Sequence, residues 1–210
     1  MASTGRRFST GLQFLDRLLD GGIPAGSLLA LHAPPASQSE LLLRELVSIH
    51  RTLYVPTLRP AAEVTAWAEA APGDVDLRAD HRRPDDLLAD PDSLIHEADP
   101  ESLLVVDPVD GVEAGDREAY VDFLTRLKRH LRETDGVGVL HCIDRGVDSP
   151  ARGTTLKRAD DVWRIELVAG SREIKTRLLV TKSRWGRALT EPVPILMTDR
   201  VRIDTSRRIA

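Results

Sequence analysis

Cysteine, aromatic residues and long apolar runs are scarce in this 210-residue sequence. Its single cysteine, Cys142, excludes an internal disulfide framework, and we interpret it as a buried thiol within the apolar run 137–143. No stretch reaches the roughly 20 apolar residues that a membrane-spanning helix needs, and no charged-then-apolar leader opens the chain. We therefore expect a cytoplasmic protein with no membrane partner.

An excess of one charge sign is lacking too. The chain has 29 Lys and Arg against 33 Asp and Glu, a formal net charge of -4. This balance gives no global attraction to nucleic acid, so any DNA contact would have to be local. Hydrophobic residues make up 41% of the chain and charged residues 30%, which fits one compact domain over residues 1–210.

Apolar segments with strand character alternate with amphipathic helical patterns. We expect strands at 27–31, 52–55, 75–78, 103–106 and 137–143, and helices near 41–49, 61–70, 84–97 and 117–133. Strands separated by helices predict an α/β fold, with a mainly parallel twisted sheet covered by helices on both faces. Shorter strands expected at 161–167, 175–181, 193–198 and 200–204 would add a C-terminal antiparallel extension.

A phosphate-binding loop lacks its phosphate-binding residues. The turn between the first expected strand and its helix has the position and length of a P-loop, G-x-x-x-x-G-K-[ST], and reads Ala33, Pro34, Pro35, Ala36, Ser37, Gln38, Ser39, Glu40. Both glycines are replaced, Ser39 stands in place of the lysine, and Glu40 stands in place of the hydroxyl residue. A carboxylate at this helix start would repel a triphosphate by several kcal/mol. The loop predicts a lost phosphate clamp.

The segment before this loop carries a long family signature. Residues 9–27, with Thr10-Gly11, Leu15-Asp16 and the run from Gly21 to Gly26, strongly resemble the opening of the KaiC/RadA branch of RecA-like ATPases. The strand ending at Asp107 resembles a Walker B strand, and the likeness continues through most of the chain, with its last segment at 182–186. The resemblance implies a RecA-like P-loop NTPase fold, here as a degenerate, archaeal-type pseudo-ATPase paralogue.

The departures from the family pattern concern catalysis. Active relatives carry one or two Glu residues after the second core strand that polarise the attacking water, whereas this chain has Thr57, Leu58 and Arg59 there. We therefore expect no catalytic residue and no bound cofactor, with ATP and Mg²⁺ entering only if the altered loop still binds a nucleotide. Asp107 is either a remnant metal ligand or a carboxylate hydrogen-bonded to the abandoned loop.

Two basic groups are candidates for other roles. In the family, a Lys-x-Arg pair reaches the nucleotide of a neighbouring subunit, which makes Lys182 and Arg184 possible trans-acting residues; a solvated hairpin end is the alternative. We expect a mobile loop at 145–158, where RecA-like recombinases bind DNA, with the possible phosphate contacts Arg145, Arg152, Lys157 and Arg158. The loop contains no aromatic residue for base stacking, so a solvated loop is again the alternative.

The six histidines show no metal-ligand spacing, and we expect no metal site. Two of them, His32 and His141, end neighbouring strands and could point into the remnant cleft.

The expected domain plan is an N-terminal family segment (1–26), an α/β core (27–144), the mobile loop (145–158) and C-terminal strands (159–210). The expected function is a non-catalytic regulatory or scaffold subunit that binds a protein partner, either a RecA/KaiC-family ATPase or a second copy, in signalling, DNA repair or gene regulation. A nucleotide-binding ATPase or switch with an altered loop, and a DNA-binding accessory protein, are the alternatives.

Overall fold

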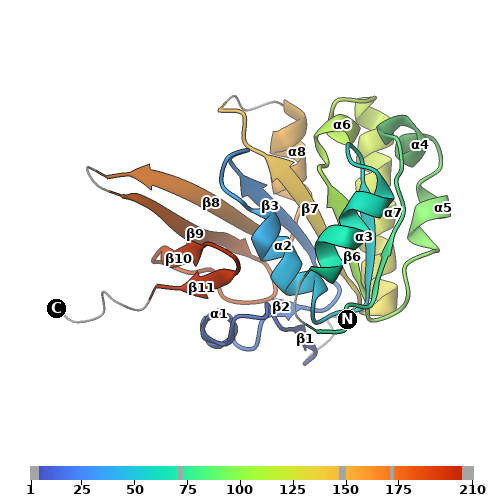
Figure 1. Ribbon diagram of the computed structural model, residues 1–210. Helices are drawn as coiled ribbons and strands as arrows, with labels where there is room; N and C mark the ends of the chain where they lie inside the picture. The colour runs from blue at the N-terminus through green and yellow to red at the C-terminus, as the bar shows by residue number, and fades with distance from the viewer. Residues whose placement is uncertain (1–4, 71–72, 147–149, 171–172, 205–210) are drawn as a thin grey trace.

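A computed structural model describes residues 5–70, 73–146, 150–170 and 173–204 of the chain. Within them, nine strands form one sheet in the order β11-β10-β9-β8-β3-β7-β6-β4-β5, with helices packed on both faces (Figure 1). The α/β architecture expected from the sequence, with its C-terminal antiparallel extension, is confirmed.

The parallel part of the sheet holds the five strands expected from the core pattern. They are β3 (Leu28–Ala33), β4 (Thr52–Pro56), β5 (Leu77–Ala79), β6 (Leu103–Asp107) and β7 (Val137–Ile143). β3 lies between β7 and β8, and all of its neighbours run parallel to it. Because β3, β7, β6 and β4 are adjacent and parallel, their carboxyl ends meet along one edge of the sheet.

The extension begins where β8 pairs parallel with β3 and then turns back on itself. Its strands, β8 (Asp161–Ala169), β9 (Ile174–Ser183), β10 (Val193–Met197) and β11 (Val201–Ile203), pair antiparallel in sequence order. In Figure 1 these strands project away from the helices of the core. At the N-terminus, β1 (Arg7–Phe8) and β2 (Ile23–Pro24) form a separate two-stranded sheet that brackets α1 (Gln13–Leu18).

The side chains of successive residues on the core strands pack alternately into two apolar clusters, one on each face of the sheet. Leu29 and Leu31 of β3 pack into the cluster that contains the buried face of α2 (Glu40–Val47) and Val64 of α3 (Ala61–Glu69). The next residues along, Leu28 and Ala30, pack into the cluster of α7 (Arg117–Thr134). This period of two is why the strands are apolar throughout: both faces are covered.

The expected helix at 84–97 is two helices, α4 (Pro84–Ala89) and α5 (Pro91–Ile95). Proline has no backbone N–H and clashes with the preceding turn, so Pro91 ends one helix and starts another. Asp90 caps the second helix by accepting from the backbone N–H of Ser93.

The expected mobile loop at 145–158 is wrong for most of its length. Residues Pro150–Arg158 form the helix α8, which lies beside α7 and follows β7. Residues 147–149 of that expected loop lie outside the described residues. The segment from Asp110 to Glu113 forms a further short helix, α6, directly after β6.

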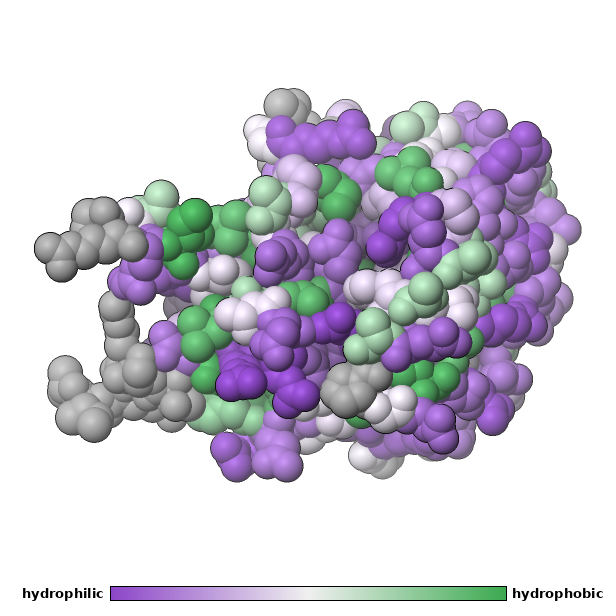
Figure 2. Space-filling view, viewed as in Figure 1, coloured by the Kyte–Doolittle hydropathy of each residue, from purple (hydrophilic) through white to green (hydrophobic). Residues whose placement is uncertain are grey.

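The described residues contain no helix that is long and apolar enough to cross a membrane. The face drawn in Figure 2 is mostly hydrophilic, with hydrophobic patches that include one over the extension. The exposed apolar side chains of the extension include Ile174 of β9, 73% exposed, and Leu196 of β10, 49% exposed.

Candidate functional site

The turn in the P-loop position, residues 33–40, joins a strand to a helix and contains no glycine. β3 ends at Ala33 and α2 begins at Glu40, and the Ser37 hydroxyl donates to the Pro34 carbonyl at 2.6 Å. Gln38, in place of the second glycine, adopts a φ of 54°, in the left-handed region that glycine enters most easily. Gln38 therefore adopts a backbone conformation that a glycine at this position would adopt without strain.

The Ser39 side chain points into the protein, toward His141 on β7. Its Oγ lies 2.9 Å from Nε2 of His141 on β7, and the two residues are 3% and 1% exposed. A P-loop lysine extends from this position to the phosphates it neutralises. Here the position is occupied by a short hydroxyl that is tied to the neighbouring strand.

Asp107, the Walker B-like carboxylate at the end of β6, is surrounded by donors. His141 Nδ1 lies 2.5 Å from one carboxylate oxygen, while the Tyr54 hydroxyl and the Arg59 guanidinium donate to the other at 2.5 and 2.8 Å. Burial acts to raise the pKa of Asp107, but the hydrogen bonds from His141 and Tyr54 and the charge of Arg59 hold that pKa below its ordinary value. Asp107 is an ionised carboxylate, and burial keeps the pKa of Tyr54 well above its ordinary value.

Together these residues form one buried chain, Ser39–His141–Asp107, continued by Tyr54 and Arg59. We call these five residues the Ser39–Arg59 network. Tyr54, Asp107 and His141 lie on the adjacent strands β4, β6 and β7. Ser39 and Arg59 lie in the segments that follow β3 and β4, so the carboxyl edge of the sheet brings the five residues together.

The residues present do not fit ATP with Mg²⁺ in the manner of a P-loop ATPase. Mg²⁺ requires oxygen ligands in near-octahedral geometry, and both oxygens of Asp107 are already taken by nitrogen and hydroxyl donors. The P-loop hydroxyl residue, which binds Mg²⁺ in a P-loop NTPase, is replaced by Glu40, which is half-buried at the start of α2. Arg59, in the segment where KaiC/RadA-type ATPases carry a carboxylate, places a cation beside Asp107 and supplies no base. Among the described residues, no group of three or more His, Cys, Asp or Glu could hold a metal ion.

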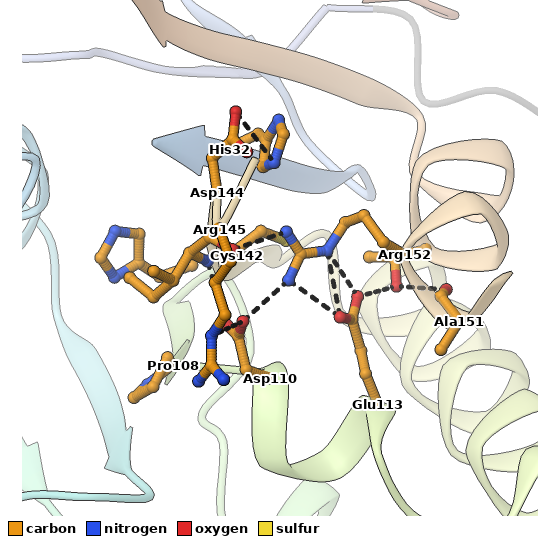
Figure 3. Close-up of polar contacts among 12 residues, drawn as sticks. His32, Pro108, Asp110, Glu113, Cys142, Asp144, Arg145, Ala151 and Arg152 are labelled. Carbon is orange, nitrogen blue, oxygen red and sulfur yellow. Dashed lines mark hydrogen bonds and ion pairs between the residues drawn. The ribbon is translucent and has the colours of Figure 1, made fainter. Parts of the chain in front are cut away.

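A second polar cluster lies beside this edge, around Arg152 of α8 (Figure 3). The Arg152 side chain is 7% exposed and donates from Nε to both carboxylate oxygens of Glu113, at 2.9 and 3.0 Å. It also donates to Asp110 and to the carbonyl of Ile143. A cavity of about 590 Å³ adjoins the cluster, with Asp110, Glu113, Arg145, Arg152, Pro108 and Leu58 in its wall.

The structure does not bring the four predicted DNA-contact residues into one loop. Arg152 is buried, and Arg158 donates to Thr125 of α7. Lys157 is exposed on α8, and the Arg145 side chain is 73% exposed before that helix. A buried arginine that bridges two carboxylates contributes to the fold, and DNA binding by this segment stays a prediction.

Lys182 and Arg184 make contacts within the chain. The Lys182 ammonium donates to the carbonyls of Leu156, Lys157 and Ala159 at 3.0, 3.0 and 2.6 Å, at the end of α8. Burial and the nearby Arg184 lower the pKa of this lysine. Arg184 lies 3.5 Å from Asp160, a fully buried carboxylate that also pairs with Lys128. Their proposed action on a partner's nucleotide stays a prediction.

Sequence reasoning placed Asp107 and Ser39 at this edge but missed how they are joined. His141 was considered as a residue of the cleft, whereas Tyr54 and Arg59 were not connected to Asp107. One signal was available: Tyr54, Asp107 and His141 each occur in or at the end of an apolar run that predicts a core strand. Strand order is a long-range property, however, and the sequence pattern does not give it.

The fold agrees with a solved structure of low sequence identity. The crystal structure of the KaiC-like protein PH0186 from the hyperthermophilic archaeon Pyrococcus horikoshii OT3 matches with a TM-score of 0.76 and 18% identity, covering 94% of this chain and 98% of that one. This likeness shows a KaiC-like, RecA-type fold. No curated protein matches the sequence. One family model covers residues 7–210, and by that match the chain belongs to the family of unknown function DUF7125.

Proposed function

We propose that this chain is a RecA/KaiC-like subunit that does not hydrolyse ATP and that acts by binding a protein partner in signalling, DNA repair or gene regulation. The observation that carries the proposal is the Ser39–Arg59 network. In this network Ser39, at the P-loop lysine position, is linked through His141 to Asp107, the Walker B-like carboxylate. Arg59, from the catalytic-base segment, donates to the same carboxylate. A site whose functional groups satisfy each other in the ground state has none left to bind and polarise a triphosphate.

The first test is nucleotide turnover. Purified protein with labelled ATP and Mg²⁺ is expected to release no phosphate above the background rate. Phosphate release that disappears in Asp107→Ala would refute the proposal, because Asp107 would then still serve the reaction.

The alternative that has support of its own is nucleotide binding without hydrolysis. The backbone N–H groups of Ser39 and Glu40 have no hydrogen-bond acceptor among the described residues, and free N–H groups at a helix start attract anions. Glu40 opposes this by its charge. Calorimetric titration with ADP and ATP decides between the two: a saturable signal that Ser39→Asp abolishes would establish a nucleotide-binding switch, and its absence supports the partner-binding subunit.

The partner is proposed to be an ATPase of the same fold. Leu167 of β8 and Ile174 of β9 are exposed on the same face of the extension, because Leu167 pairs with Thr176, two residues from Ile174. These side chains support protein binding, since exposed apolar patches mark interaction sites. Affinity purification from the native cell is expected to recover a protein with an intact Gly-Lys-Thr loop. Ile174→Asp should abolish its recovery, whereas Ile49→Asp, an exposed isoleucine of the core region, should retain it.

The trans-acting proposal for Lys182 and Arg184 is tested on the same complex. If these cations serve the partner's nucleotide, Arg184→Ala slows the partner's ATP turnover while the complex stays assembled. An unchanged turnover rate would reject it. A third role, DNA binding by the Arg145–Arg158 segment, predicts an affinity that falls steeply as salt concentration rises.

A further inference from the structure

Three residues of the Ser39–Arg59 network have the order and contacts of a nucleophilic triad. Ser39 Oγ lies 2.9 Å from His141 Nε2, and His141 Nδ1 lies 2.5 Å from Asp107 Oδ1. A serine nucleophile needs a base within about 2.6–3.2 Å and a third group that orients the base. Both conditions are met, on three different elements of one sheet edge.

The charge of Asp107 sets the direction of the hydrogen bonds. An ionised carboxylate only accepts, so the His141 ring must present Nδ1 as a donor to it. In the neutral ring Nε2 is then the acceptor, and Ser39 donates its hydroxyl proton to Nε2. This is the tautomer in which a histidine can remove a serine proton.

Tyr54 and Arg59 hold the carboxylate in place. They donate to Asp107 Oδ2, the oxygen that His141 does not use, at 2.5 and 2.8 Å. The Tyr54 residue is fully buried, and the Arg59 side chain is 33% exposed. The third member of the triad is thereby fixed in position and kept anionic, as an orienting group needs to be.

Ser39 also stands at a place where an oxyanion can be stabilised. It lies between the central strand β3 and the first residue of the eight-residue helix α2. The N–H groups of Ser39 and of Glu40, the residue that follows it, lack an acceptor within the described ranges. In strand-turn-helix nucleophile sites, the N–H of the residue after the serine is one of the two oxyanion donors.

We propose that Ser39 is the nucleophile of an acyl-transfer site that hydrolyses short-chain carboxylic esters, with His141 as general base and Asp107 as the group that orients His141. The function goes beyond the proposed partner binding and does not depend on it. The acyl chain of the proposed substrate is short because Ser39 is only 3% exposed, whereas the preceding residue, Gln38, is exposed at the surface.

The reaction balances with water as the co-reactant. Ser39 Oγ bonds to the ester carbonyl carbon as its proton passes to His141 Nε2, and the N–H groups of Ser39 and Glu40 stabilise the oxyanion. The bond from carbon to the alkoxy oxygen then breaks, and the proton on Nε2 moves to the departing alcohol. Water, deprotonated by His141, attacks the acyl-serine, and a carboxylic acid leaves as Ser39 regains its proton.

A covalent probe tests the nucleophile directly. Diisopropyl fluorophosphate forms a bond from Ser39 Oγ to phosphorus, releases fluoride and transfers the serine proton to His141. Mass spectrometry of the treated full-length chain is expected to show one modification, located by peptide mapping at Ser39. Ser39→Ala should lose it, and His141→Gln should slow it by about 100-fold, the lower range for a general base.

Ser102→Ala is the matched control. Ser102 is also 3% exposed and its hydroxyl is also hydrogen-bonded, but to the carbonyl of Asp99 and to no histidine. It should react like the wild type. Release of 4-nitrophenolate from 4-nitrophenyl acetate should follow the same order among the variants. An unmodified wild type, or a modification that persists in Ser39→Ala or proceeds at full rate in His141→Gln, would overturn the proposal.

Discussion

Asp107 remains ionised at 4% exposure because three side chains donate to it. Its pKa in the folded protein is below the ordinary 3.8, so the charge stabilises the fold above that pH, and this stabilisation is lost as the pH falls through the folded pKa. We predict that Asp107→Asn lowers the free energy of unfolding at neutral pH by about 1–3 kcal/mol, the typical cost of a disrupted buried hydrogen bond. The difference from the wild type should shrink below pH 3.8. Urea unfolding across this pH range measures it, and a difference independent of pH would contradict it.

The sequence predicts which catalytic groups of a P-loop ATPase are absent, but it does not predict the contacts that the substituted residues make. The absence of the P-loop lysine follows directly from Ser39, and the absence of a catalytic carboxylate follows from Leu58 and Arg59. The hydrogen bond from Arg59 to Asp107 does not follow, because these residues are 48 positions apart and meet only when β4 and β6 pair. The absence of a catalytic residue can be seen at a single position of the sequence, whereas the hydrogen bonds that its substitute makes depend on tertiary contacts.

Arg152, which the sequence pattern predicted as a DNA contact, fixes helix α8 against the core through buried ion pairs. Arg152 forms a buried bridge to Glu113 and Asp110, and its removal takes the cation from Glu113 and leaves Asp110 with the longer contact to Arg145, at 3.9 Å. We predict that Arg152→Met lowers the free energy of unfolding by about 3 kcal/mol, as for other broken buried pairs. Arg158→Met, on the same helix but bonded at the surface to Thr125, should cost less than about 1 kcal/mol. Equal losses in thermal or urea unfolding would show that the buried bridge contributes nothing specific.

The end of α8 provides a separate prediction. The Lys182 ammonium donates to three carbonyls at the last turn, where a helix leaves its carbonyls unpaired and carries partial negative charge. Lys182→Met should destabilise the protein by about 1 kcal/mol and speed amide hydrogen exchange in the last turn of α8. Lys175→Met, on the same strand β9 but paired with Glu173, is the control that should leave this exchange unchanged. If exchange in α8 is the same in both variants, Lys182 does not cap the helix.

The elements show why sequence patterns succeed for strands and fail for α8. The apolar runs of β3, β4, β6 and β7 predict buried strands wherever they are placed, because both faces of the sheet are covered. The α8 segment contains Gly153, Thr154 and Thr155, residues with weak helix propensity. Its helix is stabilised by Arg152, by Thr155 against Glu113 and by Lys182, contacts that local propensity does not include. Tertiary contacts therefore decide the conformation of this segment.

At the scale of the whole molecule, the sheet couples its two faces. Leu29 and Leu31 of β3 face one apolar cluster and Leu28 and Ala30 face the other, and the same alternation occurs along β6 and β7. Because the two clusters share these strands, unfolding of the strands exposes the apolar side chains of both clusters at once. The helices of both faces should therefore unfold together as one cooperative unit.

Two natural reporters allow this prediction to be checked. Trp163 on β8 belongs to the cluster of α2, and Cys142 on β7 belongs to the cluster of α7; both are buried. Burial raises the pKa of the Cys142 thiol, so it should react with a disulfide reagent only after its face opens. With Trp67→Phe and Trp185→Phe leaving Trp163 as the single tryptophan, fluorescence and thiol reactivity should change at the same urea concentration. Separate midpoints would mean that one helical layer detaches while the sheet persists, because only then can one reporter be exposed without the other.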